Sequence, residues 1–416
     1  MKTHIRYVMR KTRGKPYKLS FCLFLILLFY STPKSNAQVN LGPDTTICNG
    51  NGMTLDAGFG YDAYLWSDGS TNQTLSVNTS GDYHITVTDS ANANLGCLKY
   101  DWATQTIGSY LRVESIAVDD SGNVYCIGDF KGTIDFDPGV GTMNLTSLGI
   151  TDIFIKKSDA NGNLIWVKQI GGISNDNGTS ITLDMHGNIY TTGFFSQTVD
   201  FDPGQNTEFL TSAGGRDTYI QKLNNSGELI WVKQIKNISG VFGNAITLDI
   251  WGNIYTTGYF MGDTDFDPGT ANYNLSSTLL GSSSTKDIFI QKLDSSGNFV
   301  WAKKMGGTNE DIGLDIVVDT FENVYTTGYF GGTANFDPGA GAFNLTSNGL
   351  SDIFIQKLDA SGNLAWAIQA GSSDIDIGQS LTLDSSGNVY ITGDFKGTID
   401  FDPGAGVFNL TSNGLS

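Results

Sequence analysis

The chain has 416 residues, with 24 basic and 42 acidic side chains and a formal net charge of −18. This charge argues against nucleic acid and anionic membrane surfaces as partners. Only five of the acidic residues are glutamates, whereas glycine occupies 52 positions. Because Asp and Gly favour turns and Glu favours helices, the composition argues against a helical protein. Hydrophobic residues at 39%, with 17 Tyr and 24 Phe, exclude a disordered chain and predict an all-β protein rich in turns.

Residues 1–37 have the order of a secretory signal peptide. A basic stretch without acids reaches Lys18, an apolar run of 12 residues covers Leu19–Tyr30, and Ser35-Asn36-Ala37 offers small residues for cleavage. A run of 12 residues is short for a bilayer, although a membrane anchor is the alternative. We expect a secreted or cell-surface protein without a transmembrane segment in the mature chain. That mature chain would carry 16 basic and 42 acidic residues, a net charge of −26.

Export also decides how the cysteines are interpreted. Cys48 and Cys97 bracket one short segment, and an oxidising destination favours a disulfide between them. Cys126 lies in a run typical of a strand, where we expect a small buried hydrophobic residue. The two histidines beyond Ala37 are far apart in sequence, so the chain shows no His/Cys cluster with the spacing of a zinc site.

Residues 38–98 form the first predicted module. Short alternating runs separated by Gly and Asp-Gly are the pattern of a small β-sandwich. The stretches Leu41–Cys48, Tyr64–Gly69 and Gly81–Val87 resemble the Ig-like or PKD-like modules of exported Bacteroidetes proteins. The resemblance implies an Ig-like fold that serves as a spacer or a ligand module.

Residues 99–416 are repetitive, which is the strongest feature of the sequence. An Asp/Asn-Phe-Asp-Pro-Gly motif recurs at intervals of 65, 65, 70 and 65 residues, and a tryptophan recurs at almost the same intervals. Fixed periods of this kind indicate a repeat architecture. The phenylalanines of the motif are Phe136, Phe201, Phe266, Phe336 and Phe401.

Each repeat carries two hairpin patterns, for example Ser180–Tyr190 and Asp287–Lys303. In both, an Asp at the start of the turn can accept backbone hydrogen bonds, and a Gly takes the positive φ that closes the loop. Two hairpins make four strands, the content of one propeller blade. Runs such as Ile153–Ile155 are apolar on both faces, as a strand between two blades requires. A parallel β-helix is the structural alternative, but its coils are usually shorter.

The repeats resemble the SBBP-type β-propeller repeats of secreted bacterial proteins. The resemblance rests on Ser115–Tyr125, Asp352–Leu358 and Trp301–Gly307, and it recurs in register from about residue 100 onward. It implies an all-β fold in which a small Ig-like β-sandwich precedes a β-propeller of four-stranded blades, each of ~65 residues. Four complete blades and parts of a fifth are visible, so we interpret the sequence as a truncated piece of a longer protein.

The aspartates of the repeated motif are candidate metal ligands. Spaced carboxylates and carbonyls in a turn can bind calcium, which takes six to eight oxygens. The EF-hand pattern is absent, and the motif favours the alternative of a tight turn capped by its first Asp. The candidates are Asp135, Asp137, Asp200, Asp202, Asp265, Asp267, Asp337, Asp400 and Asp402, with Asn335 in place of the first acid in the fourth copy.

The sequence contains no recognisable catalytic constellation. It has no Gly-x-Ser-x-Gly elbow, no Cys/His pair and no phosphate loop. A second acidic loop, Asn309–Asp311 and its counterpart Asp374–Asp376, is interpreted as a solvated connection. We expect a non-catalytic binding or scaffold protein that presents propeller loops to an extracellular protein or glycan, with calcium as the one cofactor considered. The alternatives are an extracellular carbohydrate-active enzyme and a calcium-stabilised adhesin, both using acidic propeller loops.

Overall fold

The structure is a computed structural model of the chain, and it describes residues 53–56, 63–66, 68–77, 85–88, 110–402, 404, 406–412 and 414. All regular secondary structure in these residues is β, which confirms the expected class. The described strands fall into two compact units, one with β1–β4 and one with β5–β34. The predicted signal peptide and the predicted disulfide of Cys48 with Cys97 lie outside the described residues. In the described part of the chain, no helix has the length and apolar character to span a membrane.

The first unit consists of two antiparallel strand pairs. β1 (Met53–Asp56) pairs with β3 (Thr74–Val77), and β2 (Ala63–Trp66) pairs with β4 (Ile85–Thr88). Trp66 is buried, and its indole N–H donates to the carbonyl of Asn72 at 2.8 Å. The Ig-like sandwich itself stays a prediction.

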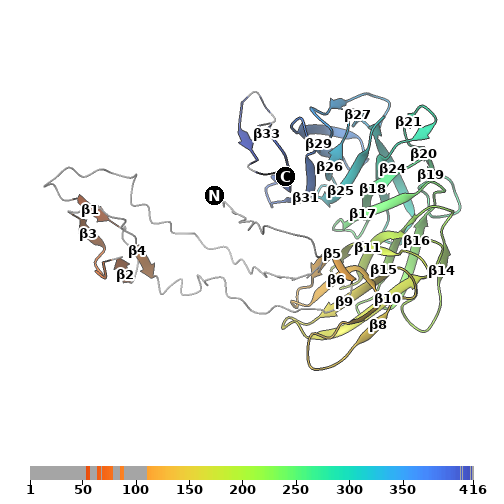
Figure 1. Ribbon diagram of the computed structural model, residues 1–416, viewed down its shortest axis with the longest axis horizontal. Coiled ribbons are helices and arrows are strands. Elements are labelled where there is room, and N and C mark those ends of the chain that lie inside the picture. Colours follow the sequence, from red (N-terminus) through yellow and green to blue (C-terminus); the bar gives the residue numbers. More distant parts are fainter. Residues whose placement is uncertain are drawn as a thin grey trace. The chain divides into compact units, whose positions relative to one another are not determined.

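The second unit is a series of antiparallel sheets through which the chain meanders (Figure 1). We name the meandering strands of each repeat a repeat sheet and number these I to V. Sheet I contains β5 (Tyr110–Val118), β6 (Val124–Lys131), β9 (Asp152–Ser158) and β10 (Leu164–Gly172). Sheet II contains β11 (Asn177–Leu183), β12 (Ile189–Phe195), β15 (Asp217–Leu223) and β16 (Leu229–Ile235).

The later repeat sheets follow the same order along the chain. Sheet III contains β17 (Val241–Leu248), β18 (Ile254–Phe260), β23 (Asp287–Leu293) and β24 (Phe299–Gly307). Sheet IV contains β25 (Asp311–Val318), β26 (Val324–Phe330), β29 (Asp352–Leu358) and β30 (Leu364–Ala370). Of sheet V the structure describes β31 (Ile377–Leu383) and β32 (Val389–Asp394).

A short hairpin arm lies between the second and third strands of each repeat. The arms are β7 (Thr133–Asp135) with β8 (Asn144–Thr146), β13 (Thr198–Asp200) with β14 (Phe209–Thr211), β19 (Asp263–Asp265) with β20 (Asn274–Ser276), β27 (Thr333–Asn335) with β28 (Asn344–Thr346), and β33 (Thr398–Asp400) with β34 (Asn409–Thr411). The insertion in the third repeat forms β21 (Leu279–Leu280) and β22 (Ser283–Ser284).

The hairpin arms reach back to the preceding repeat. β13 pairs with the end of β10, and β27 pairs with the end of β24, so these two sheets have six strands where four were expected. The close approach requires glycine on the receiving strand. A Cβ added at Gly307 would lie 2.0 Å from the carbonyl oxygen of Thr333.

Successive repeat sheets are also joined through their first strands. The Ser115 hydroxyl accepts from the N–H of Ile181 at 3.3 Å, and the Ser180 hydroxyl accepts from the N–H of Ile246 at 3.2 Å. Each of these bonds crosses from one repeat to the next, at the bulge where the register of the first strand shifts. The first strands therefore lie beside one another in chain order.

The core takes the motif phenylalanines. Phe136 packs against Phe130 of β6 and Phe154 of β9, with ring centroids 5.4 and 5.0 Å apart. The second to fourth repeats have the same three-ring arrangement, with Tyr219 at the third position of the second repeat. Ile153–Ile155 are buried, as their apolar pattern predicts. Cys126 is half-buried, where a buried residue was predicted, and it packs against the same cluster. Desolvation raises the pKa of its thiol to about 11.

Candidate functional site

The first residue of each repeated motif caps its own turn. Asp265 Oδ1 accepts from the N–H groups of Asp267 and Tyr273 at 3.0 and 2.8 Å. Asp267 Oδ1 in turn accepts from the N–H of Gly269 at 2.7 Å. The corresponding bonds are made in the other copies by Asp135 with Asp137, Asp200 with Asp202, Asn335 with Asp337, and Asp400 with Asp402.

Asn335 shows that the capping role needs no charge. Its Oδ1 accepts from the N–H groups of Asp337 and Phe343 at 3.0 and 2.8 Å, as the aspartates do. Among the described residues no three His, Cys, Asp or Glu side chains gather as a metal-ion site. The geometry supports the tight-turn interpretation, and calcium binding stays a prediction.

The second acidic loop is only partly solvated. Glu310 is exposed, but Asp311 and its counterpart Asp376 are fully buried, so the interpretation as a solvated connection was wrong for these two residues. Asp311 accepts from the N–H groups of Gly307 and Gly331 at 2.6 and 3.2 Å, which compensates the carboxylate for lost water. Burial raises the pKa of Asp311 to about 8, and the charge of nearby Asp287 adds to the rise.

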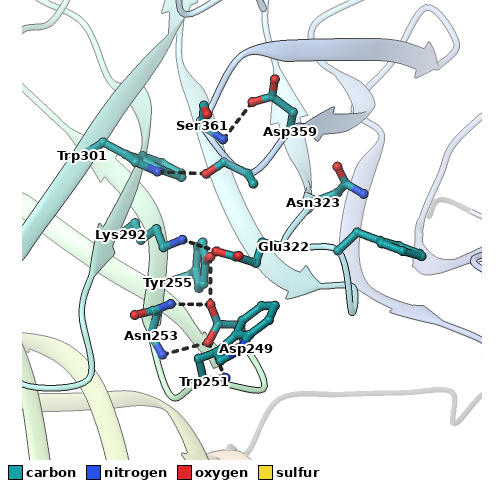
Figure 2. A network of polar contacts seen from close by, with 12 residues as sticks. Asp249, Trp251, Asn253, Tyr255, Lys292, Trp301, Glu322, Asn323, Asp359 and Ser361 are labelled. Atoms are coloured by element: carbon teal, nitrogen blue, oxygen red, sulfur yellow. Dashed lines mark hydrogen bonds and ion pairs between the residues drawn. The ribbon is translucent and has the colours of Figure 1, made fainter.

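Each of sheets I–IV holds a cluster of Asp, Tyr, Lys and Trp at the end where its tight turns lie. Tyr255, Lys292 and Trp301 stand opposite one another on three adjacent strands of sheet III. The Lys292 Nζ lies 5.0 Å from the centre of the Tyr255 ring, and the Tyr255 hydroxyl donates to Asp249 at 3.1 Å (Figure 2). The corresponding residues are Asp119, Tyr125, Lys157 and Trp166 in sheet I, Asp184, Tyr190, Lys222 and Trp231 in sheet II, and Asp319, Tyr325, Lys357 and Trp366 in sheet IV.

A side chain of sheet IV covers the cluster of sheet III. Figure 2 shows Glu322 extending from the β25–β26 turn toward Lys292, and Glu322 Oε2 lies 2.6 Å from Lys292 Nζ. Glu322 has a φ of 62°, a conformation that the other copies of this turn give to glycine. The glycines at this position are Gly122, Gly187, Gly252 and Gly387.

A side chain of sheet II covers the cluster of sheet I from a different turn. Asn225 lies in the β15–β16 turn, and its Oδ1 accepts from the Tyr125 hydroxyl at 3.1 Å and from the Lys157 ammonium group. Two different positions of the following repeat can therefore cover the lysine and tyrosine, and each position does so at one boundary.

At the boundary between sheets II and III both positions hold small residues. Gly252 stands where sheet IV has Glu322, and Ser295 stands where sheet II has Asn225. Here the structure has a cavity of about 560 Å³, lined among others by Tyr190, Lys222, Gly252 and Ser295. We name it the II–III cavity.

The turns between the first and second strands of sheets II–IV carry exposed apolar residues. The exposed fractions are 86% for Met185, 64% for Ile250, 57% for Trp251 and 79% for Phe321. All four lie in the turns between the first and second strands of sheets II–IV, and we name them the tip residues. The same turn carries Asp120-Ser121 in sheet I and Ser385-Ser386 in sheet V. Unlike the repeated aspartates, the tips differ from copy to copy.

A comparison with known families supports the repeat architecture. A family model described as a β-propeller repeat, SBBP, matches residues 165–193 and 365–394. Both matches run from the fourth strand of one repeat sheet into the first two strands of the next. These two segments are similar to SBBP-type β-propeller repeats.

Two curated proteins share similarity with the repeats. An uncharacterized WD repeat-containing protein of Acanthamoeba polyphaga mimivirus is 24% identical over 235 residues, which cover 50% of this chain and 17% of that protein. The regulatory protein FlaEY of Caulobacter vibrioides is 27% identical over 124 residues, which cover 29% of this chain and 13% of that protein. The chain thus spans less than a fifth of either relative.

A solved structure also aligns with the chain. The crystal structure of a protein of unknown function from Bacteroides caccae covers 64% of this chain and 85% of its own, at 11% identity and a TM-score of 0.26. A TM-score this low carries no argument about the fold.

The sequence contains a signal for the tip residues, namely apolar side chains at turn positions, which the sequence-based predictions did not use. Asp249 and Gly252 frame the turn in register with the other copies, so Ile250 and Trp251 are apolar residues at positions that Asp and Ser fill in sheets I and V. The cavity had no signal of its own, because Gly and Ser are ordinary turn residues. The cavity exists because the described residues of sheet III supply no side chain that covers Tyr190 and Lys222.

Proposed function

We propose that the protein is a non-catalytic, exported binding protein. In this proposal the repeat sheets are the blades of a β-propeller, and the tight-turn end that carries the tip residues docks on an extracellular protein. The Ig-like module serves as a spacer. The predicted signal peptide supports export.

The observation that carries the proposal is the exposure of Met185, Ile250, Trp251 and Phe321 on three successive turns. Large apolar side chains at turn tips gain nothing for the fold, because they contact little of the core. Grouped exposed apolar residues mark interaction surfaces. Trp, Phe and Met are enriched in protein interfaces, with Trp prominent among hot spots, and this composition favours a protein over a glycan as the partner.

The tips are held rigidly. Asp249 Oδ1 accepts from the N–H groups of Trp251 and Asn253 at 3.0 and 2.9 Å. Asp319 Oδ1 makes the same pair of bonds with Phe321 and Asn323, both at 2.9 Å. A preformed turn loses little conformational entropy on binding, so each apolar tip contributes more of its contact energy to affinity.

An array of purified extracellular proteins tests the proposal with the full chain as the soluble partner. The tip variant combines Met185→Ser, Ile250→Ser, Trp251→Ser and Phe321→Ser. The control variant replaces four equally exposed apolar residues of arms and connections, through Val140→Ser, Leu148→Ser, Ile173→Ser and Ile238→Ser. We expect proteins that bind the native chain to bind the control within about threefold, and the tip variant at least 100-fold more weakly, a loss of about 3 kcal/mol.

The melting temperatures of both variants establish that they are folded. The proposal is overturned if every bound protein keeps its affinity for the tip variant. It is also overturned if no protein binds and a printed glycan array binds the native chain instead.

A further inference from the structure

We infer that the II–III cavity receives a carboxylate side chain, glutamate or aspartate, of the protein that docks on the tips. The inference rests on the proposed function, and it specifies the chemistry of the partner. The chain itself supplies the precedent, because Glu322 places a carboxylate at the same position one sheet later.

The receiving groups are equivalent at the two boundaries. Tyr190, Lys222 and Trp231 stand opposite one another on β12, β15 and β16, as Tyr255, Lys292 and Trp301 do in sheet III. The Nζ of Lys222 lies 4.8 Å from the centre of the Tyr190 ring, close to the 5.0 Å of Lys292 over Tyr255. The same geometry that binds Glu322 is therefore present in the II–III cavity.

The ion pair of Lys222 is much longer than that of Lys292. Within the described residues it makes one ion pair, with Asp184 Oδ2 at 4.0 Å, whereas Lys292 has Glu322 at 2.6 Å. The Asp184 carboxylate is already engaged by Asn188, through its backbone N–H at 2.9 Å and its amide at 2.8 Å. Lys222 can thus donate to a further acceptor at hydrogen-bond distance.

Among the described residues, no side chain of sheet III occupies the position next to Lys222 that Glu322 occupies next to Lys292. Gly252 has a φ of 81°, close to the 62° of Glu322, so its backbone already has the conformation from which a glutamate reaches the lysine. A Cβ at Gly252 would have the Cβ of Ser295 at 3.5 Å as its contact, so a side chain has room there, at the cost of backbone strain from the positive φ. The cavity is lined by one lysine and by Asp184 and Asp249, which favours a single negative charge over a dianion such as phosphate.

The tip residues close the site from outside. Met185, Ile250 and Trp251 line the II–III cavity as well as standing at the surface. An apolar partner surface pressed on these side chains excludes water from the carboxylate and lysine. A charge-assisted hydrogen bond is stronger in such an environment than in water. The tip residues supply contact area, and Lys222 supplies specificity for a carboxylate.

Peptide binding tests the inference directly. The probe is the chain's own turn, a cyclised peptide of residues 317–325, and its partner is the same peptide with glutamine in place of glutamate. Isothermal titration of the full chain should show that the glutamate peptide binds at least tenfold more tightly than the glutamine peptide. Lys222→Met should remove the II–III site and lower the number of bound glutamate peptides by one.

Two substitutions test the role of the covering carboxylate, one by adding it at the II–III boundary and one by removing it at the III–IV boundary. Gly252→Glu should place an internal carboxylate on Lys222 and abolish peptide binding at the II–III cavity. Glu322→Gly should open a further cavity at Lys292 and raise the stoichiometry by one peptide. Ser296→Ala, in the same β23–β24 turn as Ser295, is the matched control and should bind as the native chain does.

The inference is overturned if both peptides bind equally, or if Gly252→Glu binds the peptide unchanged. Binding of free glucuronate without binding of the peptide also overturns it, in favour of an acidic sugar. If the peptide result is negative and the tip variant still loses its protein partners, only this inference fails. If the peptide binds and the tip variant keeps every partner, the proposed function fails and the carboxylate site stands.

Discussion

Glu322 of sheet IV and Lys292 of sheet III form an ion pair, with 2.6 Å between Oε2 and Nζ. The lysine side chain is 8% exposed and the glutamate side chain 27% exposed, so solvent screens the pair only in part. The pair joins two repeats through a residue held at a φ of 62°, a conformation that the other copies of the turn give to glycine. The effect of this ion pair on the free energy of unfolding therefore measures how one repeat stabilises the next.

Glu322→Gln should lower the free energy of unfolding by about 1–2 kcal/mol, because the neutral amide leaves a mostly buried ammonium group without its anion. Chemical denaturation of the two proteins at the same salt concentration measures the difference. Glu228→Gln is the control, since Glu228 is exposed in the β15–β16 hairpin of sheet II and accepts from Asn224 at 2.7 Å. Equal destabilisation by both substitutions would contradict a specific role for the pair.

Gly307→Ala should destabilise the protein by about 2 kcal/mol or more, because the added Cβ would lie 2.0 Å from the carbonyl oxygen of Thr333. The methyl group separates β24 from β27 and so breaks the pairing between an arm and the preceding sheet. Amide hydrogen exchange should show faster exchange in β27 and β28. Gly139→Ala is the control, because its Cβ would meet only the carboxylate of Asp137 at 3.1 Å.

Stability should decline as the pH rises from about 4 to about 8, through the titration of Asp311. Burial raises the pKa of this carboxyl to about 8 in the folded chain, so the folded state binds its proton more tightly than the unfolded state does. The contribution is complete below the unfolded pKa and is lost as the pH passes the folded one. For one proton the slope is at most about 1.4 kcal/mol per pH unit.

Denaturation midpoints between pH 5 and 8 measure this decline. Asp311→Asn should flatten it, although one of the two backbone N–H groups of Gly307 and Gly331 then loses its side-chain acceptor. Burial also raises the pKa of Asp176 to about 6, so a shallower dependence on the acidic side of the window should persist in the variant. An unchanged profile in Asp311→Asn would show that this carboxyl does not control the pH dependence.

Asp265→Asn should change stability by less than about 0.5 kcal/mol, because Asn335 already makes the same backbone bonds with an amide oxygen. Asp265→Ala should cost about 1–2 kcal/mol, since the N–H groups of Asp267 and Tyr273 lose their acceptor. Thermal melting in millimolar calcium and in chelator should give the same midpoint. A calcium-dependent rise that Asp265→Asn reduces would instead support the predicted calcium site.

Much of the architecture could be predicted because it is local. Asp119 and Gly122 lie three residues apart, and the structure places them at the two ends of one tight turn, with a hydrogen bond of 2.9 Å from the Gly122 N–H to the Asp119 carbonyl. The insertion in the third repeat forms a small hairpin of its own at β21 and β22. Turn chemistry acts over a few residues, so a repeated motif reveals it in a single chain.

The sequence by itself determined the all-β class, the period of the repeats and their turns. Only the tertiary structure decided that Asp311 is buried while Glu310 is exposed, that an arm pairs with the preceding sheet, and that Gly252 and Ser295 leave a lysine uncovered. Each of these depends on residues of two different repeats that meet only across a boundary. Since every repeat has nearly the same local pattern, the differences between boundaries arise from which side chains face each other there.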